Sequence, residues 1–331
     1  GRKHLCMFST LKFQQEDGLN TVLPYGIRKI NALRTLTTES TAVFMPFKTQ
    51  EVMDNNGLFY GVNAISHNLI LCNRKLLQNG NGWILGVPGS GKSFFAKFEM
   101  ILNILYNTED DIIIVDPEAE YKNIMKAIGG EHIVISAASN NHINALEMVK
   151  DYGDGDNPIN VKAQFIMSLY EQIVGAGKVK AQERSIIDRA VAQIYEKYMI
   201  DYEGEPPTLV DFYNVLKTFT EPEARDIALA MELFTEGSLN VFAHQSNVDV
   251  HNRIICYDIL DLGEQLKPVG LLVMLDNIMN RVIANRHKGK YTHIYIDEAH
   301  LFFANKFSSE FLARAWKRFR KYGGLITGNT Q

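Results

Sequence analysis

The chain has 331 residues, 46% of them apolar, and its 34 basic and 38 acidic residues give a formal net charge of −4. This length suits one large α/β domain or two ordinary domains, with enough apolar residues for a full core. The near balance of charge argues against a chain that binds polyanions by charge alone, although a local basic face would be compatible with it.

Neither the apolar runs nor the cysteines indicate a membrane span or an oxidising compartment. Apolar pieces such as DIIIVD and GLLVML are far shorter than the roughly 20 residues that span a bilayer. Cys6, Cys72 and Cys256 show no paired spacing, which favours a reducing cytoplasm over a disulfide framework or a zinc site. The chain opens on Gly1 and stops at Gln331, at an expected strand end, so we interpret it as a piece of a longer protein.

The first predicted elements are two strands that form an antiparallel hairpin. They lie in GLFYGVNAISHNLILCNR, residues 57–74, and are joined at Ser66-His67-Asn68, at the edge of a larger sheet. Short, continuous apolar runs then predict strands that are buried on both faces. These strands are Gly82–Gly86, Asp111–Asp116, His132–Ser136, Arg253–Leu260, Thr292–Asp297 and Gly324–Asn329. Helical patterns at Ser93–Tyr106 and Ala119–Ile128 alternate with them, which implies a parallel sheet with helices on both faces.

Residues 158–234 contain no good strand pattern. Four amphipathic helical patterns take its place, separated by Gly and Pro in GAG, GEPP and EP. They are Pro158–Val174, Val179–Ile200, Thr208–Phe219 and Pro222–Phe234. We interpret residues 151–247 as an all-helical subdomain inserted into the α/β domain, which would comprise residues 36–150 and 248–331.

The strongest motif is GVPGSGKS, residues 86–93, which matches G-x-x-x-x-G-K-[ST] between a strand and a helix. Glycines in such a loop let backbone N–H groups curl around phosphate oxygens at the positive end of the helix. The lysine neutralises the β and γ oxygens, and the hydroxyl is a Mg²⁺ ligand. The alternative is a chance glycine turn. The candidate nucleotide-binding residues here are Gly86, Pro88, Gly89, Ser90, Gly91, Lys92, Ser93 and Phe94.

An acidic motif, THIYIDEAH, ends a predicted buried strand in Asp297-Glu298. Asp297 is the candidate Mg²⁺ ligand beside Ser93, and Glu298 is placed to polarise an attacking water. The same acidic pair could instead cap the following helix. We expect His300 to be a surface or packing residue, since Lys92 and Asp297 are farther apart than in helicases that carry a DEAH box.

Two further polar stretches have open interpretations. Gln331, after the strand in GLITGNTQ, either senses the γ-phosphate at the nucleotide edge of the sheet or simply meets water. In DPEAEY, Asp116 either caps a helix that has Pro117 at its first position, or faces the nucleotide together with Glu120.

The segment EFLARAWKRFRKYGG, residues 310–324, predicts a helix with five cations. One helical face combines Arg314, Arg318 and Lys321, and another combines Lys317 and Arg320. The simplest interpretation is a solvated face with cations near the helix C-terminus. Alternatively, one arginine reaches the nucleotide of a neighbouring subunit as an arginine finger. A second basic cluster, within residues 281–290, is predicted to be a solvated loop.

Together these segments resemble the VirB-four ATPases of type IV secretion and conjugation systems, within the FtsK/HerA group of RecA-like motors. The matching text is STAVFMPF, GLFYGVNAISHNLILCNRKLLQNGNGWILGVPGSGKS, IIIVDPEAEY, IYIDEAH and RKYGGLITGNTQ. The lead-in to the glycine loop separates the chain from coupling proteins and from plain translocases. The resemblance implies a RecA-like three-layer α/β/α P-loop NTPase domain with a helical subdomain. Residues 1–35 would be the exit from a missing N-terminal domain, and the family motor continues past Gln331.

The same resemblance implies ATP or ADP and Mg²⁺ as cofactors. It assigns Lys92 and Ser93 to nucleotide binding, Asp297 and Glu298 to magnesium and catalysis, Gln331 to the polar sensor and Arg320 to the finger. The expected function is Mg²⁺-dependent ATP hydrolysis that powers assembly of, or transport through, a secretion channel. The protein would self-associate and dock through other secretion components on the cytoplasmic membrane face; its charge does not indicate DNA as a partner. Two alternatives are a DNA translocase of the FtsK/HerA type and a nucleotide-binding scaffold with little turnover.

Overall fold

The computed structural model describes residues 10–31, 35–43, 49–153, 155–175, 177–248, 252–263, 265–303 and 306–330. These residues belong to two compact units, the first ending at Gln50 and the second beginning at Glu51. In the first unit the structure shows two short helices, α1 (Gln15–Val22) and α2 (Thr38–Ala42). The second unit contains both predicted nucleotide motifs.

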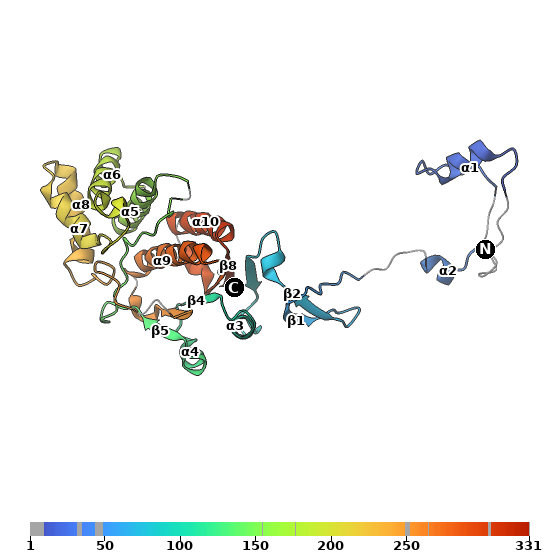
Figure 1. Ribbon diagram of the computed structural model, residues 1–331, viewed down its shortest axis with the longest axis horizontal. Helices are drawn as coiled ribbons and strands as arrows, with labels where there is room; N and C mark the ends of the chain where they lie inside the picture. Colours follow the sequence, from blue (N-terminus) through green and yellow to red (C-terminus); the bar gives the residue numbers. More distant parts are fainter. Residues whose placement is uncertain are drawn as a thin grey trace. The chain divides into compact units, whose positions relative to one another are not determined.

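The centre of the second unit is a six-stranded parallel sheet (Figure 1). Its spatial order is β3-β8-β7-β4-β6-β5, and each neighbouring pair is parallel. The strands are β3 (Gly82–Leu85), β4 (Asp111–Asp116), β5 (Glu131–Val134), β6 (Ile254–Asp258), β7 (Thr292–Ile296) and β8 (Gly324–Thr330). The six predicted strands are confirmed, with ends within two residues of the prediction.

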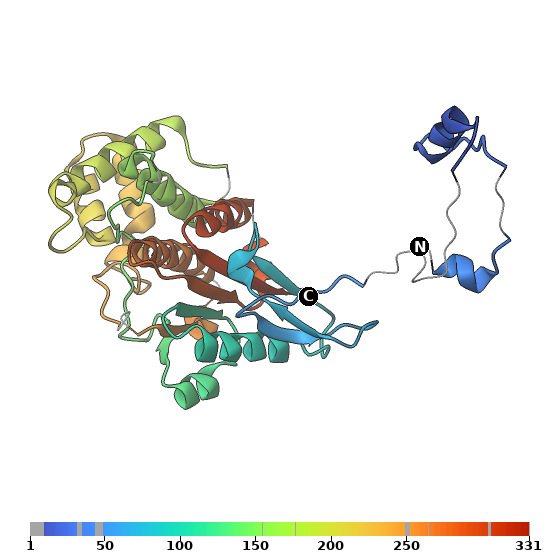
Figure 2. The same cartoon turned by 45° about the vertical axis from the view of Figure 1, so that its right-hand side comes forward.

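Helices cover both faces of this sheet. In β4, Ile112 and Ile114 join an apolar cluster with α3 (Lys92–Tyr106) and α4 (Lys122–Ile128). Ile113 and Val115 belong to the larger cluster on the other face, which includes α9 (Lys267–His287) and α10 (Lys306–Lys321). Because alternate strand residues point to opposite faces, a continuous apolar strand serves both layers. Figure 2 shows the sheet between the two helical layers, so the predicted α/β/α fold is confirmed.

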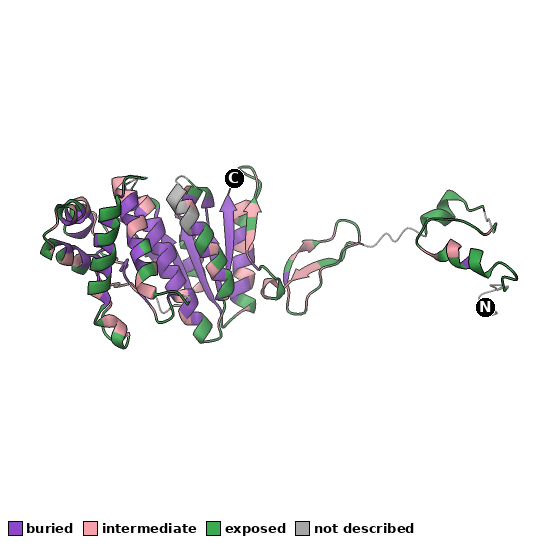
Figure 3. Ribbon diagram, turned by 90° about the horizontal axis from the view of Figure 1, so that it is seen from above, coloured by how far each residue is buried: buried purple, intermediate pink, exposed green. Residues whose placement is uncertain are grey.

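Helix α9 is the one long element that the sequence patterns do not predict. Fifteen of its 21 residues are buried, so it lacks the polar stripe by which an amphipathic helix is recognised. Figure 3 shows this burial, in contrast to the half-exposed edge strand β3. Arg281 and Arg286 lie on α9, so the prediction of a loop over residues 281–287 is wrong. No helix in the described ranges is both long and apolar enough to cross a membrane.

The predicted hairpin is present as β1 (Leu58–Val62) and β2 (Leu69–Cys72), in a separate two-stranded sheet rather than as an extension of the large sheet. It packs on α3 instead. The rings of Phe59 and Phe98 meet edge to face with centroids 6.5 Å apart. Tyr60 donates its O–H to Glu99 Oε1 at 3.1 Å. The hairpin therefore braces the helix that follows the glycine loop.

The four predicted helices between residues 158 and 234 are confirmed. They are α5 (Pro158–Val174), α6 (Ala181–Tyr195), α7 (Leu209–Thr218) and α8 (Pro222–Thr235). The starts of α5 and α7 carry capping residues for their unpaired N–H groups. Asn157 accepts from the Ile159 N–H ahead of α5, and Thr208 forms a capping box with Asp211 at α7.

A buried ion pair joins α5 to α9. Lys162 is fully buried, and its Nζ lies 2.7 Å from Asp276 Oδ2 and donates to Glu147 O at 2.7 Å. Tyr152 donates its O–H to the other oxygen of Asp276. Burial lowers the pKa of Lys162, because the ammonium loses its water, and the Asp276 carboxylate opposes this shift. The pair fixes the start of the helical segment against the sheet-covering helix.

Replacing Lys162 with Met should lower the free energy of unfolding by about 3–5 kcal/mol, because Asp276 would remain buried without its cation. Urea denaturation followed by circular dichroism measures the loss. The double variant Lys162→Met, Asp276→Asn should lose less than Lys162→Met alone. Equal losses in the two variants would contradict the ion-pair explanation.

Candidate nucleotide-binding site

The glycine loop connects the end of β3 at Leu85 to the start of α3 at Lys92. Gly89 and Gly91 have φ angles of +77° and +88°, a region that side chains other than glycine rarely adopt. Gly86 is required for space, since an added Cβ would lie 2.5 Å from Ser90 Oγ. The loop is therefore a compact turn whose shape depends on all three glycines.

Solvent reaches this loop and the helix start that follows it. Pro88 and Ser90 are exposed, and Lys92 and Ser93 are half-buried. The Lys92 ammonium donates to Val87 O at 3.3 Å, which folds the side chain back over the loop. An anion bound at the loop would therefore meet the first N–H groups of α3 and this ammonium together. Phe94 is 77% exposed, on the outer side of the same helical turn.

Asp297 directly follows β7 and is almost fully buried, with 4% of its surface exposed. Its Oδ1 accepts two hydrogen bonds, from Asn329 Nδ2 at 2.7 Å and from the Glu298 N–H at 3.0 Å. Burial raises the pKa of Asp297 to about 6, and the nearby carboxylates of Glu120, Glu298 and Asp116 add to the rise. A cation at this carboxylate would relieve both effects.

Glu298 occupies a strained backbone position beside Asp297. Its φ of +46° is left-handed, which is rare for a residue with a long side chain. Its Oε2 lies 2.9 Å from His300 Nδ1, at ion-pair distance but without hydrogen-bond alignment. His300 is exposed, so the prediction of a surface residue is confirmed, and it also touches the candidate base.

The two motifs lie at the same edge of the sheet because their strands run parallel. Only β8 separates β3 from β7. In register, Leu85 pairs with Thr330 and Gly328 pairs with Ile296, so the ends of β3 and β7 lie within two residues of each other along β8. This carboxyl edge is where parallel α/β sheets bind ligands.

Two polar residues at the end of β8 lie between the motifs, and the sequence does not single them out. Asn329 and Thr330 are buried, with 3% and 9% exposure. Asn329 Oδ1 and Thr330 Oγ1 have no hydrogen-bond partner within the described part of the chain. Buried polar atoms of this kind are expected to bind water or a ligand. With the Ser93 hydroxyl and the Asp297 carboxylate, the edge offers the oxygen donors that Mg²⁺ takes.

No cluster of three or more His, Cys, Asp or Glu among the described residues is arranged to hold a metal. A Mg²⁺ ion at this edge would therefore be completed by phosphate oxygens and water rather than by a protein cage. That donor set fits a nucleotide-bound ion. It does not fit a resident structural metal.

Asp116 and Glu120 have structural partners. The Asp116 carboxylate accepts from the N–H groups of Glu118, Glu120 and Tyr121 at 3.3, 3.1 and 2.9 Å. It fixes a turn ahead of α4, so the helix begins at Lys122 rather than at Ala119 and has Tyr121, not Asp116, at its N-cap. Glu120 Oε2 lies 2.7 Å from the Nζ of Lys97, one turn after Ser93 on α3, so it stands near the candidate site.

Arg320 lies near the amino ends of the strands, at the edge of the sheet opposite to the glycine loop. It is the last residue but one of α10, which precedes β8, and β8 is seven residues or roughly 20 Å long. It lines a cavity of about 350 Å³ with five other cations and without an acidic residue. The six cations are Arg74, Lys75, Arg286, Lys290, Arg320 and Lys321. Within one chain, this arginine is too far from the glycine loop to contact the same phosphate.

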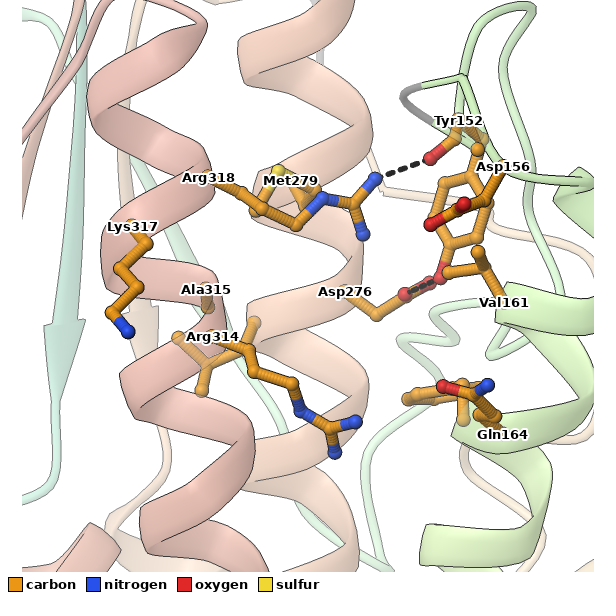
Figure 4. A pocket seen from close by; sticks show the side chains of 13 residues that line it. Tyr152, Asp156, Val161, Gln164, Asp276, Met279, Arg314, Ala315, Lys317 and Arg318 are labelled. Atoms are coloured by element: carbon orange, nitrogen blue, oxygen red, sulfur yellow. Dashed lines mark hydrogen bonds between the residues drawn. The ribbon is translucent and has the colours of Figure 1, made fainter.

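The other predicted cations of α10 divide between two cavities. Arg314, Lys317 and Arg318 line a second cavity, whereas Lys321 shares the cavity of Arg320. Figure 4 shows Arg314 and Arg318 on one side of α10 and Lys317 on the other, as the predicted faces require. Leu312, Ala315 and Phe319 form the buried side of this helix. The predicted sensor Gln331 lies outside the described residues.

Asp297→Asn should stabilise the nucleotide-free chain at pH 7.5 by about 2 kcal/mol, because the folded carboxylate ionises near pH 6 instead of 3.8. The folded state holds the proton more tightly, so the stability of the unmodified chain falls as pH rises from 3.8 to 6. Urea denaturation without Mg²⁺ at both ends of this range and at pH 7.5 measures the effect. A variant that gains nothing at pH 7.5 would contradict it.

Comparisons with known proteins agree with this arrangement. The family described as the TraG P-loop domain matches residues 65–331. The structure of VirB4 from Thermoanaerobacter pseudethanolicus superposes with a TM-score of 0.69 at 23% identity, over 85% of this chain and 79% of that chain. A search of curated proteins finds no match.

The plasmid coupling protein TrwB, in complex with ADP and Mg²⁺, gives a TM-score of 0.47 at 16% identity, over 76% of this chain and 63% of its own. At this level it adds no argument. The predicted resemblance to VirB-four-type ATPases is confirmed by the family match and by the shared fold. The chain belongs to the TraG P-loop domain family.

Proposed function

We propose that the chain is a Mg²⁺-dependent ATPase that powers assembly of, or transport through, a type IV secretion or conjugation channel. The observation that supports hydrolysis most is the placement of the glycine loop and the Asp297–Glu298 pair at one edge of the sheet, separated by β8 alone. Binding of triphosphate and activation of water require these two groups to meet there.

Each residue has a distinct part in this proposal. The loop N–H groups and the Lys92 ammonium hold the β and γ phosphates. Ser93 and Asp297 face the metal, which, when bound, neutralises charge on the transferred phosphoryl group. Glu298 takes up the proton of the attacking water or orients that water. Asn329 Nδ2 donates to Asp297 Oδ1 and so fixes that carboxylate. Asp297 Oδ2 takes no part in this hydrogen bond.

The contact of Glu298 with His300 supports a gated base. The Glu298 carboxylate lies 2.9 Å from His300 Nδ1, and its backbone has a strained φ of +46°. A movement that separates the two side chains would release Glu298 toward the nucleotide. The strained backbone is the kind of local strain that functional sites store.

The role of the ATPase in secretion rests on the family match and on the lead-in motif before the glycine loop. The near-neutral composition gives no support to a motor that grips nucleic acid along its whole surface. The chain would then act at the cytoplasmic membrane face through partner proteins. Unchanged hydrolysis on addition of DNA favours this function, and salt-sensitive stimulation by DNA would favour a translocase.

Self-association would complete the active site. Arg320 is held at the edge of the sheet opposite to the glycine loop, in a cavity lined by cations. Such an arginine can stabilise the transition-state charge only on the nucleotide of another copy. Hydrolysis would then depend on assembly.

Lys92→Ala should reduce ATP hydrolysis by at least about 100-fold, because the main cation on the β and γ phosphates is lost. Phosphate release measured under saturating Mg²⁺ tests this, with Glu298→Gln as a second variant that should still bind nucleotide. Circular dichroism confirms that the fold is intact. Normal turnover in Lys92→Ala would contradict the assignment of the site.

Arg320→Ala should remove the part of turnover that grows with protein concentration and leave the rate at high dilution unchanged. Turnover per chain and sedimentation are measured together over the same dilution series. Arg184→Ala, an exposed arginine on α6, is the matched control and should behave as the unmodified chain. A rate that is the same for monomer and assembly would exclude a finger in trans.

A further inference from the structure

A second cavity lies between α5, α9 and α10 (Figure 4). Its volume is about 350 Å³, a size in the lower range of ligand pockets. Apolar side chains from all three helices line it, among them Val161, Phe165, Leu275, Met279 and Ala315. The cavity can therefore accept one or two large apolar groups.

Two arginines of α10 lie at the rim of this cavity, beside the apolar side chains that form its floor. Figure 4 shows Arg314 and Arg318 projecting from α10 toward α5, while Lys317 points away from that gap. Arg314 is exposed. Arg318 donates one N–H to Tyr152 O, which leaves other donors of its guanidinium available. The rim of the cavity is thus cationic.

The carboxylates nearby do not cancel this charge. Asp276 lines the cavity, but its two oxygens are already taken by Lys162 and by the Tyr152 hydroxyl. Asp156 is the second acidic residue of the lining and lies on the α5 side, as Figure 4 shows. A ligand that approaches from the α10 side meets Arg314 and Arg318 first, while Asp156 is exposed across the cavity.

We propose that this cavity and the two arginines form a docking groove for an acidic amphipathic helix of a partner protein. Arg314 and Arg318 are four residues apart on one helix, which spaces them by roughly 6 Å along its axis. Glutamates four residues apart on a second helix repeat that spacing, and arginine binds carboxylates through paired N–H donors. Leucine side chains on the adjacent stripe of such a helix would fill the apolar floor.

The groove is tested with a fluorescein-labelled helical peptide that carries Glu at two positions four apart and Leu on the neighbouring stripe. Fluorescence anisotropy against the full chain should show saturable binding that weakens as salt is raised. Arg314→Ala should weaken binding by at least about tenfold, since a charge-assisted pair is lost. Gln164→Trp, at an exposed position whose side chain faces the cavity, should block the apolar floor.

Two controls keep the result specific. Arg225→Ala makes the same change at an exposed arginine on α8, outside the cavity, and should bind the peptide as the unmodified chain does. The peptide with Gln in place of Glu should bind at least about tenfold more weakly.

Three results would overturn the proposal. The first is no binding up to the millimolar range, and the second is binding that Arg314→Ala leaves unchanged. The third is displacement of the peptide by single-stranded DNA with loss of DNA binding in Arg314→Ala, which would make the groove a phosphate-binding surface instead. Because none of these measurements involves hydrolysis, they do not depend on the proposed ATPase activity.

Discussion

The parallel pairing of β3, β8 and β7, in one fixed register, is the constraint on which the site depends. A slip of one residue between β8 and either neighbour would turn Asn329 to the other face of the sheet and away from Asp297. The pairing also buries the polar end of β8. Asn329 and Thr330 lie there between the glycine loop and the Asp297–Glu298 pair. The apolar residues of β8 that hold this register, such as Ile326, serve the chemistry without touching it.

Fold prediction from the sequence succeeds here where a pattern is local and has clear ends. Continuous apolar runs such as Asp111–Asp116 reveal strands covered on both faces, and glycine or proline marks the ends of α5 and α8. The same reasoning misses α9, because a helix that is buried nearly all round has no polar stripe to reveal its period. It also misplaces the start of α4, since the Asp116 carboxylate binds three N–H groups of a turn before the helix can begin.

Site prediction follows the same division. The glycine loop and the Asp297–Glu298 pair are recognisable because each is a contiguous motif with a fixed chemical purpose. Asn329 reads as an ordinary strand residue, and its importance comes from a hydrogen bond to a side chain 32 residues away. His300 is similar, since only its approach to Glu298 distinguishes it. The position of Arg320 at the far edge also needs the fold, because a helix sequence does not say which end of a strand it precedes.

The ion pair between Lys162 and Asp276 has a mechanical consequence. Separating α5 from α9 would expose an ammonium and a carboxylate from a dry interior, so this junction is a poor place for a hinge. The first helix of the 158–234 segment is thereby a rigid-body extension of the layer that covers the sheet. Any swing of that segment during a working cycle would have to take place farther along, among α6, α7 and α8, whose packing is mainly apolar and can slide by shear.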